Sequence, residues 1–95
     1  MAGELILVVD DGQEMRDFIV DTILHPNGYR SLQARDGRDG FEKILQHQPD
    51  LVLLDYQLPR MNGIEVLEAM RARGIETPVI LMTFYGSEEV AIEVY

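Results

Sequence analysis

The 95-residue chain has no cysteine and no tryptophan, and only eight basic residues against 17 acidic ones. Without cysteine, disulfide bonds and thiolate metal sites are excluded. A formal net charge of −9 makes nucleic acid an unsuitable partner, because binding to phosphates needs a basic face. We therefore expect no direct contact with nucleic acid, and we expect a cation to be the more suitable ligand.

Long apolar runs are also missing, since no stretch approaches the about 20 residues that a membrane-spanning helix needs. The first four residues, Met1 to Glu4, place no basic segment ahead of the following apolar stretch, which is unlike a secretory signal. Hydrophobic residues make up 46% of the chain, which is enough for a packed core. The sequence predicts one soluble domain over residues 1–95, located in the cytoplasm and without membrane contact.

Three short apolar runs predict strands that are buried on both faces. They are rich in leucine and β-branched residues and too short for helices, which is typical of the interior of a parallel sheet. These runs are Leu5 to Val9, Leu51 to Leu54 and Val79 to Met82. A weaker run from Arg30 to Gln33 predicts a strand at the edge of the sheet.

Helical periodicity fills the segments between these strands, with apolar residues recurring at three- and four-residue steps. The stripes are Met15, Phe18, Ile19 and Ile23; Phe41, Ile44 and Leu45; and Ile64, Leu67 and Met70. Pro49 is expected to end the second helix, and Gly74 to cap the third. Ser87 resembles an N-cap and predicts a fourth helix that runs to Tyr95. The order β-α-β-α-β-α-β-α predicts a doubly wound α/β fold with a parallel sheet.

Acidic and hydroxyl side chains follow the predicted strands. The first strand is followed by Asp10 and Asp11, the third by Asp55 and the fourth by Thr83. In a parallel sheet the carboxyl ends of the strands meet at one edge, where ligands bind. Clustered carboxylates repel one another unless a proton or a hard divalent cation is present, and Mg²⁺ binds through carboxylates and phosphate oxygens. From the residues alone, helix-capping roles for these aspartates remain an equal alternative.

Three segments carry a resemblance that decides between these alternatives. The runs LVVDD at 7–11, DYQLPRMNG at 55–63 and PVILMT at 78–83 are similar, in order and spacing, to the receiver domains of two-component response regulators. The resemblance covers essentially the whole chain. It implies a flavodoxin-like or CheY-like fold, of which this chain would hold four of the usual five βα units and end within the fourth helix.

The resemblance also implies the role of each site residue. Asp55 would be the phosphoacceptor, Asp11 a direct Mg²⁺ ligand and Asp10 a ligand through water. The backbone carbonyl of Gln57 would complete the protein ligands of the metal. The hydroxyl of Thr83 would turn toward the phosphoryl group and act as the switch.

Pro59 and Gly63 would shape the turn into the third helix, either for the site or simply for the fold. Two features depart from the family. The fifth strand and its lysine are not present, and Lys43, the only lysine, is expected on a solvated helix face. Phe84 is bulky where the family has a small residue, so it would either gate the phosphoryl pocket or pack against a helix. We also expect the apolar fourth strand, Val79 to Met82, to form an open edge. Through it the chain would dimerise or swap elements, or it would leave the chain only marginally stable.

The leading interpretation is a signalling switch that accepts a phosphoryl group from a sensor histidine kinase or a phosphotransfer protein. Such a domain is not an enzyme beyond self-catalysed phosphotransfer and dephosphorylation. The alternative is a docking module of the same fold that is no longer phosphorylated, consistent with the absent lysine. A Mg²⁺-dependent phosphatase is a weaker hypothesis, because no second acid follows Asp55 closely.

Overall fold

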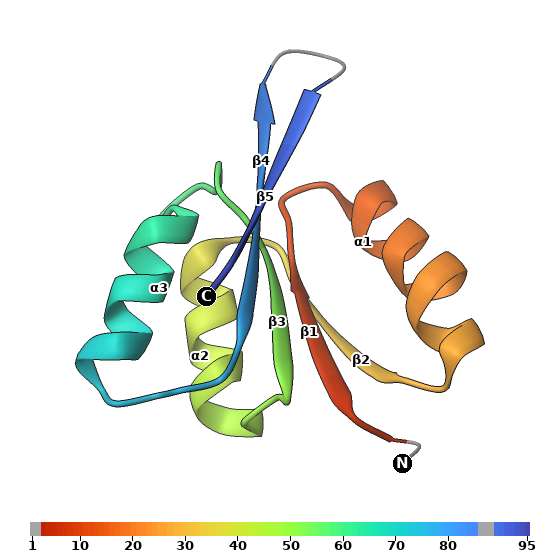
Figure 1. Cartoon of the computed structure of the whole chain (residues 1–95), viewed down its shortest axis with the longest axis horizontal. Coiled ribbons are helices and arrows are strands. Elements are labelled where there is room, and N and C mark those ends of the chain that lie inside the picture. Colours follow the sequence, from red (N-terminus) through yellow and green to blue (C-terminus); the bar gives the residue numbers. More distant parts are fainter. Residues whose placement is uncertain (1–2, 86–88) are drawn as a thin grey trace.

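The computed structural model describes residues 3–85 and 89–95, and for residues 83–85 and 89–91 it describes the backbone alone. Helices flank a sheet on both sides (Figure 1). The strands are β1 (Leu5–Val9), β2 (Arg30–Ala34), β3 (Leu51–Asp55), β4 (Val79–Tyr85) and β5 (Glu89–Val94), and the α-helices are α1 (Gln13–Ile19), α2 (Gly37–His47) and α3 (Gly63–Ala72).

The strand order is β2-β1-β3-β4-β5. The first four strands pair in parallel, which confirms the predicted α/β class, and β2 lies at an edge as expected. Strand β3 is in register with β1, so that Leu54 lies opposite Val9. The next residues along both strands, Asp55 and Asp10, are therefore brought to the same end of the sheet.

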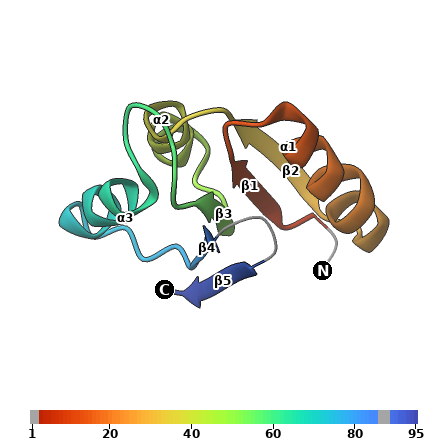
Figure 2. The same cartoon turned by 90° about the horizontal axis from the view of Figure 1, so that it is seen from above.

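Two apolar layers cover the two faces of the sheet. Helices α2 and α3 bury the larger one, and α1 with the turn that follows it buries the smaller one (Figure 2). Strand β1 is buried on both faces, as predicted. Strands β3 and β4 are fully buried only on the α2–α3 side, whereas Leu51, Leu53 and Ile80 on the α1 side are half-buried. The prediction of two buried faces is therefore wrong for β3 and β4.

The buried face of α1 differs from the predicted stripe. Phe18 is 56% exposed and Ile23 47% exposed, whereas Ile19 of the predicted stripe is buried together with Val20 and Leu24. A π-helical turn, Val20–Leu24, follows α1 directly, and the extra residue of such a turn shifts the side chains that share a face. The half-buried Arg16 also occupies part of the inner side, where it makes polar contacts.

The other two helices lie where the periodicity placed them, and side-chain caps fix where they begin. The Asp36 carboxylate accepts a hydrogen bond from the Asp39 N–H at 2.7 Å at the start of α2. Asn62 and Glu65 form a reciprocal capping box at the start of α3. Gly74 follows α3 with φ of +73°, as expected of a helix-ending glycine.

The predicted fourth helix is wrong, because residues Glu89–Val94 form β5, antiparallel to β4. The segment is rich in β-branched residues, which favour strands, and β5 satisfies the hydrogen bonds that an open β4 edge would leave unpaired. Val79 and Tyr95 exchange backbone hydrogen bonds of 2.9 and 2.7 Å at the end of this pairing. The expected dimer contact through an open β4 edge is therefore also wrong, and β5 is the edge strand.

Proline substitutions in β5 distinguish a strand from a helix. Hydrogen-bonded pairs alternate along an antiparallel ladder, so Glu93 bonds to Leu81, as Tyr95 does to Val79, while the N–H of Ile92 points to the open edge. We expect Glu93→Pro to cost about 2–3 kcal/mol of unfolding free energy in urea, and Ile92→Pro less than about 1 kcal/mol. Equal losses in both variants would contradict the strand assignment.

Candidate functional site

The loops that follow β1 and β3 lie next to each other at one end of the sheet (Figure 1). Asp10 and Asp55 are buried there, with 5% and 6% exposure, and Asp11 is exposed. One carboxylate oxygen from each of the three aspartates lies within 4.8 Å of the others. The structure therefore brings together the aspartates that the sequence placed at this edge.

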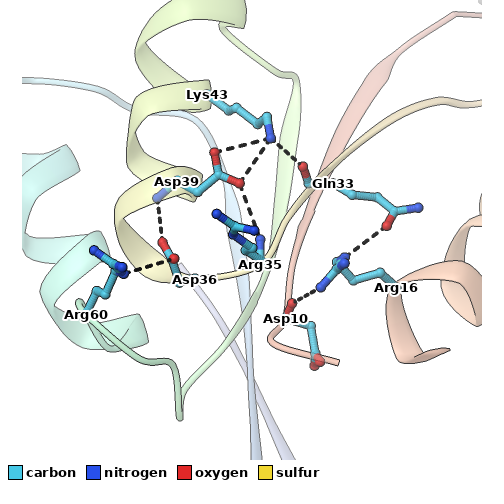
Figure 3. A network of polar contacts seen from close by, with 8 residues as sticks. All are labelled: Asp10, Arg16, Gln33, Arg35, Asp36, Asp39, Lys43 and Arg60. Atoms are coloured by element: carbon cyan, nitrogen blue, oxygen red, sulfur yellow. Dashed lines mark hydrogen bonds and ion pairs between the residues drawn. The ribbon is translucent and has the colours of Figure 1, made fainter. Parts of the chain in front are cut away.

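Three hydrogen bonds hold Asp10. Its carboxylate Oδ1 accepts from the Gly12 N–H at 2.8 Å, and its own N–H donates to the Ala34 carbonyl at 3.1 Å. Its carbonyl oxygen accepts from Arg16 Nη1 at 2.7 Å (Figure 3). Arg16 was not predicted from the sequence, because an arginine on an amphipathic helix has no local signal that separates it from a solvated residue.

Asp55 is the last residue of β3 and is fixed by its neighbours in sequence. The Gln57 N–H donates to Asp55 Oδ1 at 3.2 Å, and the Tyr56 N–H donates to the Met82 carbonyl of β4 at 2.8 Å. The pKa of the Asp55 carboxyl is raised from 3.8 to about 6, chiefly by burial and against the lowering effect of the Gln57 hydrogen bond. The charges of Asp10 and Asp11 contribute to the same rise.

The turn after Asp55 approaches the site so closely that only glycine fits at position 63. A Cβ atom on Gly63 would lie 2.6 Å from the Asp55 carbonyl oxygen. The Gly63 N–H donates to the Tyr56 carbonyl at 2.8 Å, so α3 begins directly against the acidic cluster. Pro59 lies further along the turn, where its carbonyl accepts a long hydrogen bond of 3.4 Å from the Gly37 N–H. Gln57 is exposed at the start of this turn.

The backbone of residues 83 and 84 lies at the same end of the sheet as the acidic cluster. Asp55 is in register with Met82, and Thr83 is the next residue along β4. The side chains of Thr83 and Phe84 lie outside the described residues, so the switch and gate roles stay predictions.

Lys43 is not the solvated side chain that the sequence predicted. Its Nζ donates to the Gln33 carbonyl of β2 at 2.8 Å and pairs with the Asp39 carboxylate at 3.1 Å (Figure 3). The side chain is 30% exposed and ties α2 to the sheet. The periodicity of α2 marks Lys43 as polar but gives no information on a partner in another element.

The donor set fits a hard divalent cation. Every side-chain donor in the cluster is a carboxylate oxygen, which Mg²⁺ prefers, and none is the nitrogen or sulfur that zinc sites use. The raised pKa of the Asp55 carboxyl, about 6, shows that burying this charge beside two others costs free energy, and a bound cation would offset that cost.

Comparison with known proteins agrees with this geometry. The family described as the response regulator receiver domain matches residues 6–95. This chain belongs to the response regulator receiver domain family. It is 37% identical to sporulation initiation phosphotransferase F of Bacillus subtilis, over 98% of this chain and 74% of that protein. It is 39% identical to the regulatory protein AtoC of Escherichia coli, over 93% of this chain.

Solved receiver structures share the fold. The receiver domain of Francisella response regulator 1452 superimposes with a TM-score of 0.82 at 29% identity, over 90% of this chain and 69% of that one. The chemotaxis protein CheY4 of Vibrio cholerae gives 0.80 at 29% identity, over 92% and 73% of the two chains. The receiver domain spans only 19% of AtoC, so most of that relative has no counterpart here. Among the described residues, no helix has the length and apolar character to cross a bilayer.

The receiver domain is a signalling domain of two-component systems, and its acidic cluster is consistent with a phosphoacceptor site. The raised pKa of Asp55 gives this site a measurable signature. The folded state binds the proton of Asp55 more tightly than the unfolded state, so the associated stability is fully present below pH 3.8 and is lost as the pH rises through about 6.

Asp55→Asn removes the free-energy cost of holding an ionised carboxylate at position 55 at neutral pH. In the absence of divalent cations we expect the free energy of unfolding of the variant to exceed that of the wild type by about 1–2 kcal/mol at pH 7. This gain in stability should shrink toward zero at pH 4. Urea unfolding at both pH values measures it, with Asp21→Asn on the exposed π-helical turn as the control. A gain that is the same at both pH values would contradict the assignment.

Proposed function

We propose that this receiver domain accepts a phosphoryl group on Asp55 from a phosphohistidine of a sensor histidine kinase or a phosphotransfer protein. The observation that carries the proposal is the convergence of three carboxylates, two of them buried, at the end of β1 and β3. A merely structural cap would not need to hold two further carboxylates beside a buried Asp55 whose pKa they raise.

In the proposed reaction a carboxylate oxygen of Asp55 attacks phosphorus. A P–O bond to Asp55 forms while the P–N bond of the phosphohistidine breaks, and the histidine nitrogen leaves with the electron pair and takes up a proton. Asp55 must be ionised to act as the nucleophile, which a pKa of about 6 allows at neutral pH. The Gln57 N–H already donates to Asp55 Oδ1, so Oδ2 would be the oxygen that attacks.

Asp11, Asp10 and the backbone carbonyl of Gln57 would hold Mg²⁺ together with Asp55. When bound, the cation would neutralise negative charge on the transferring phosphoryl group. Asp11 is the exposed member of the cluster and would be the direct ligand, whereas the Oδ1 atom of the buried Asp10 already accepts from Gly12 and would act through water. Soluble phosphate donors would reach the site by the same exposed side.

The response to phosphorylation would begin at Thr83. Its place one residue beyond the register partner of Asp55 supports a hydroxyl that reaches the phosphoryl group. Movement of Thr83 would be transmitted along β4. Phe84, as the next residue, would gate access to Asp55, and removing its ring would then speed both loading and hydrolysis.

Intact mass after incubation with Mg²⁺ and phosphoramidate tests the proposal. We expect one added phosphoryl group in the wild type and none in Asp55→Asn. Asp36→Asn is the matched control, because Asp36 is also a buried aspartate but caps α2 away from the cluster. This control should be loaded like the wild type.

No added mass in a folded sample that binds Mg²⁺ would contradict the proposal. That result would favour the docking module, for which the bulky Phe84 next to Thr83 is the supporting observation. Loading of Asp55→Asn to the level of the wild type would instead place the phosphoryl group on another residue.

A further inference from the structure

We propose that Arg16 is a positioning residue that holds the peptide between Asp10 and Asp11 in the orientation that cation binding needs. This inference rests on the proposed function, because it concerns the cation of the same site. Arg16 lies in the last turn of α1 and is half-buried. It reaches back toward the end of β1 rather than out to solvent (Figure 3).

Two nitrogens of the guanidinium make two separate hydrogen bonds. Nη1 donates to the Asp10 carbonyl at 2.7 Å, and Nε donates to Oε1 of Gln33 at 2.9 Å. A planar group held at two points has a fixed orientation, which a lysine ammonium on a flexible stem does not provide. Arg16 is therefore a rigid strut between the edge strand β2 and the turn that follows β1.

The carbonyl that Arg16 holds belongs to the peptide unit that links Asp10 to Asp11. Because a peptide unit is planar, fixing its oxygen also fixes the direction in which the chain continues to Asp11. Asp11 is exposed, and among the described residues no hydrogen bond to its carboxylate is found, so the backbone is the part of Asp11 that these contacts fix. Loss of the Arg16 contact would release the most exposed member of the cluster.

Gln33 keeps Arg16 in place through contacts with both sides of the sheet. Its Nε2 donates to Asp17 Oδ1 on α1 at 3.1 Å, and its carbonyl accepts from Lys43 on α2 at 2.8 Å. The Arg16 guanidinium is therefore held by contacts that involve three elements, α1, α2 and β2. Contacts of this kind preorganise a metal site from outside its ligands. Arg16, Gln33, Asp17 and Lys43 are not among the proposed ligands of the cation.

A purely electrostatic role is the competing explanation. The ion pairs found among the described side chains join Lys43 to Asp39 and Arg60 to Asp36, and neither includes Arg16. Arg16 meets a neutral carbonyl of Asp10 instead of its carboxylate. A geometric role therefore predicts that retaining the charge without the planar fork does not restore function.

The Mg²⁺ dissociation constant, measured by calorimetric titration at pH 7.5, tests the inference. We expect Arg16→Met to bind Mg²⁺ about tenfold more weakly or worse, in the range found when residues that orient metal ligands are removed. Arg16→Lys should stay within about threefold of Arg16→Met, because an ammonium cannot hold both partners. Urea unfolding of each variant identifies any change in stability.

Arg71→Met is the matched control. Arg71 also donates to backbone carbonyls, those of Ile75 and Thr77, but beyond the other end of α3 from the cluster. It should bind Mg²⁺ within about twofold of the wild type, because it orients no ligand. Equal weakening in Arg71→Met would overturn the proposal, as would an unchanged dissociation constant in Arg16→Met or full recovery in Arg16→Lys.

Gln33→Met provides the test if Arg16→Met does not fold. It leaves Arg16 in place but removes the second point of attachment, so we expect binding about threefold weaker than in the wild type. Unchanged binding would overturn the proposal. A wild-type domain that binds no Mg²⁺ would instead contradict the proposed function, so failures of the two are distinguishable.

Discussion

The parallel pairing of β1 with β3 forces negative charges together at one end of the sheet. Leu54 lies opposite Val9, so Asp55 and Asp10 follow side by side, with Asp11 next to them. Burial and mutual repulsion both oppose ionisation of Asp55. The N–H groups of Gly12 and Gln57 offset part of this cost, and a bound cation would relieve the remainder.

The surrounding structure keeps the cluster from relaxing. Gly63 lets α3 begin against the Asp55 carbonyl, where any side chain would collide with the backbone. Tyr56 is tied to β4 through its N–H, and Arg16 holds the turn after β1. The pairing of the strands places the carboxylates together, and these contacts keep the carboxylates from moving apart. Unfavourable electrostatics maintained by a rigid frame are expected at a functional site, where activity is favoured over stability.

Local patterns predicted most of the frame. The buried strands, the edge position of β2 and the helices α2 and α3 follow from periodicity and turn residues that act within a few positions. The convergence of Asp10, Asp11 and Asp55 followed from the rule for strand ends in a parallel sheet. Their roles in phosphoryl transfer came from the resemblance to receiver domains and remain proposals, as do those of Thr83, Phe84 and Gln57.

Most of the failures involve partners that are distant in sequence. Residues 89–94 form a strand because β4 would otherwise have unpaired hydrogen-bonding groups, a condition that no helical pattern reports. The buried side of α1 differs from the predicted stripe because a π-helical turn follows the helix. It also differs because Arg16 donates a hydrogen bond to Gln33, 17 residues further along the chain. Lys43 looked solvated for the same reason, since its acceptor on β2 is a backbone carbonyl without a sequence signature.

The central claim is that the fold holds Asp55 among like charges at an energetic cost that a divalent cation removes. Carbon-13 NMR of the Asp55 carboxyl, titrated with pH without and with Mg²⁺, measures this directly. The account predicts a pKa of about 6 without Mg²⁺ and a clearly lower pKa in its presence. A pKa near the ordinary 3.8 under both conditions would contradict it.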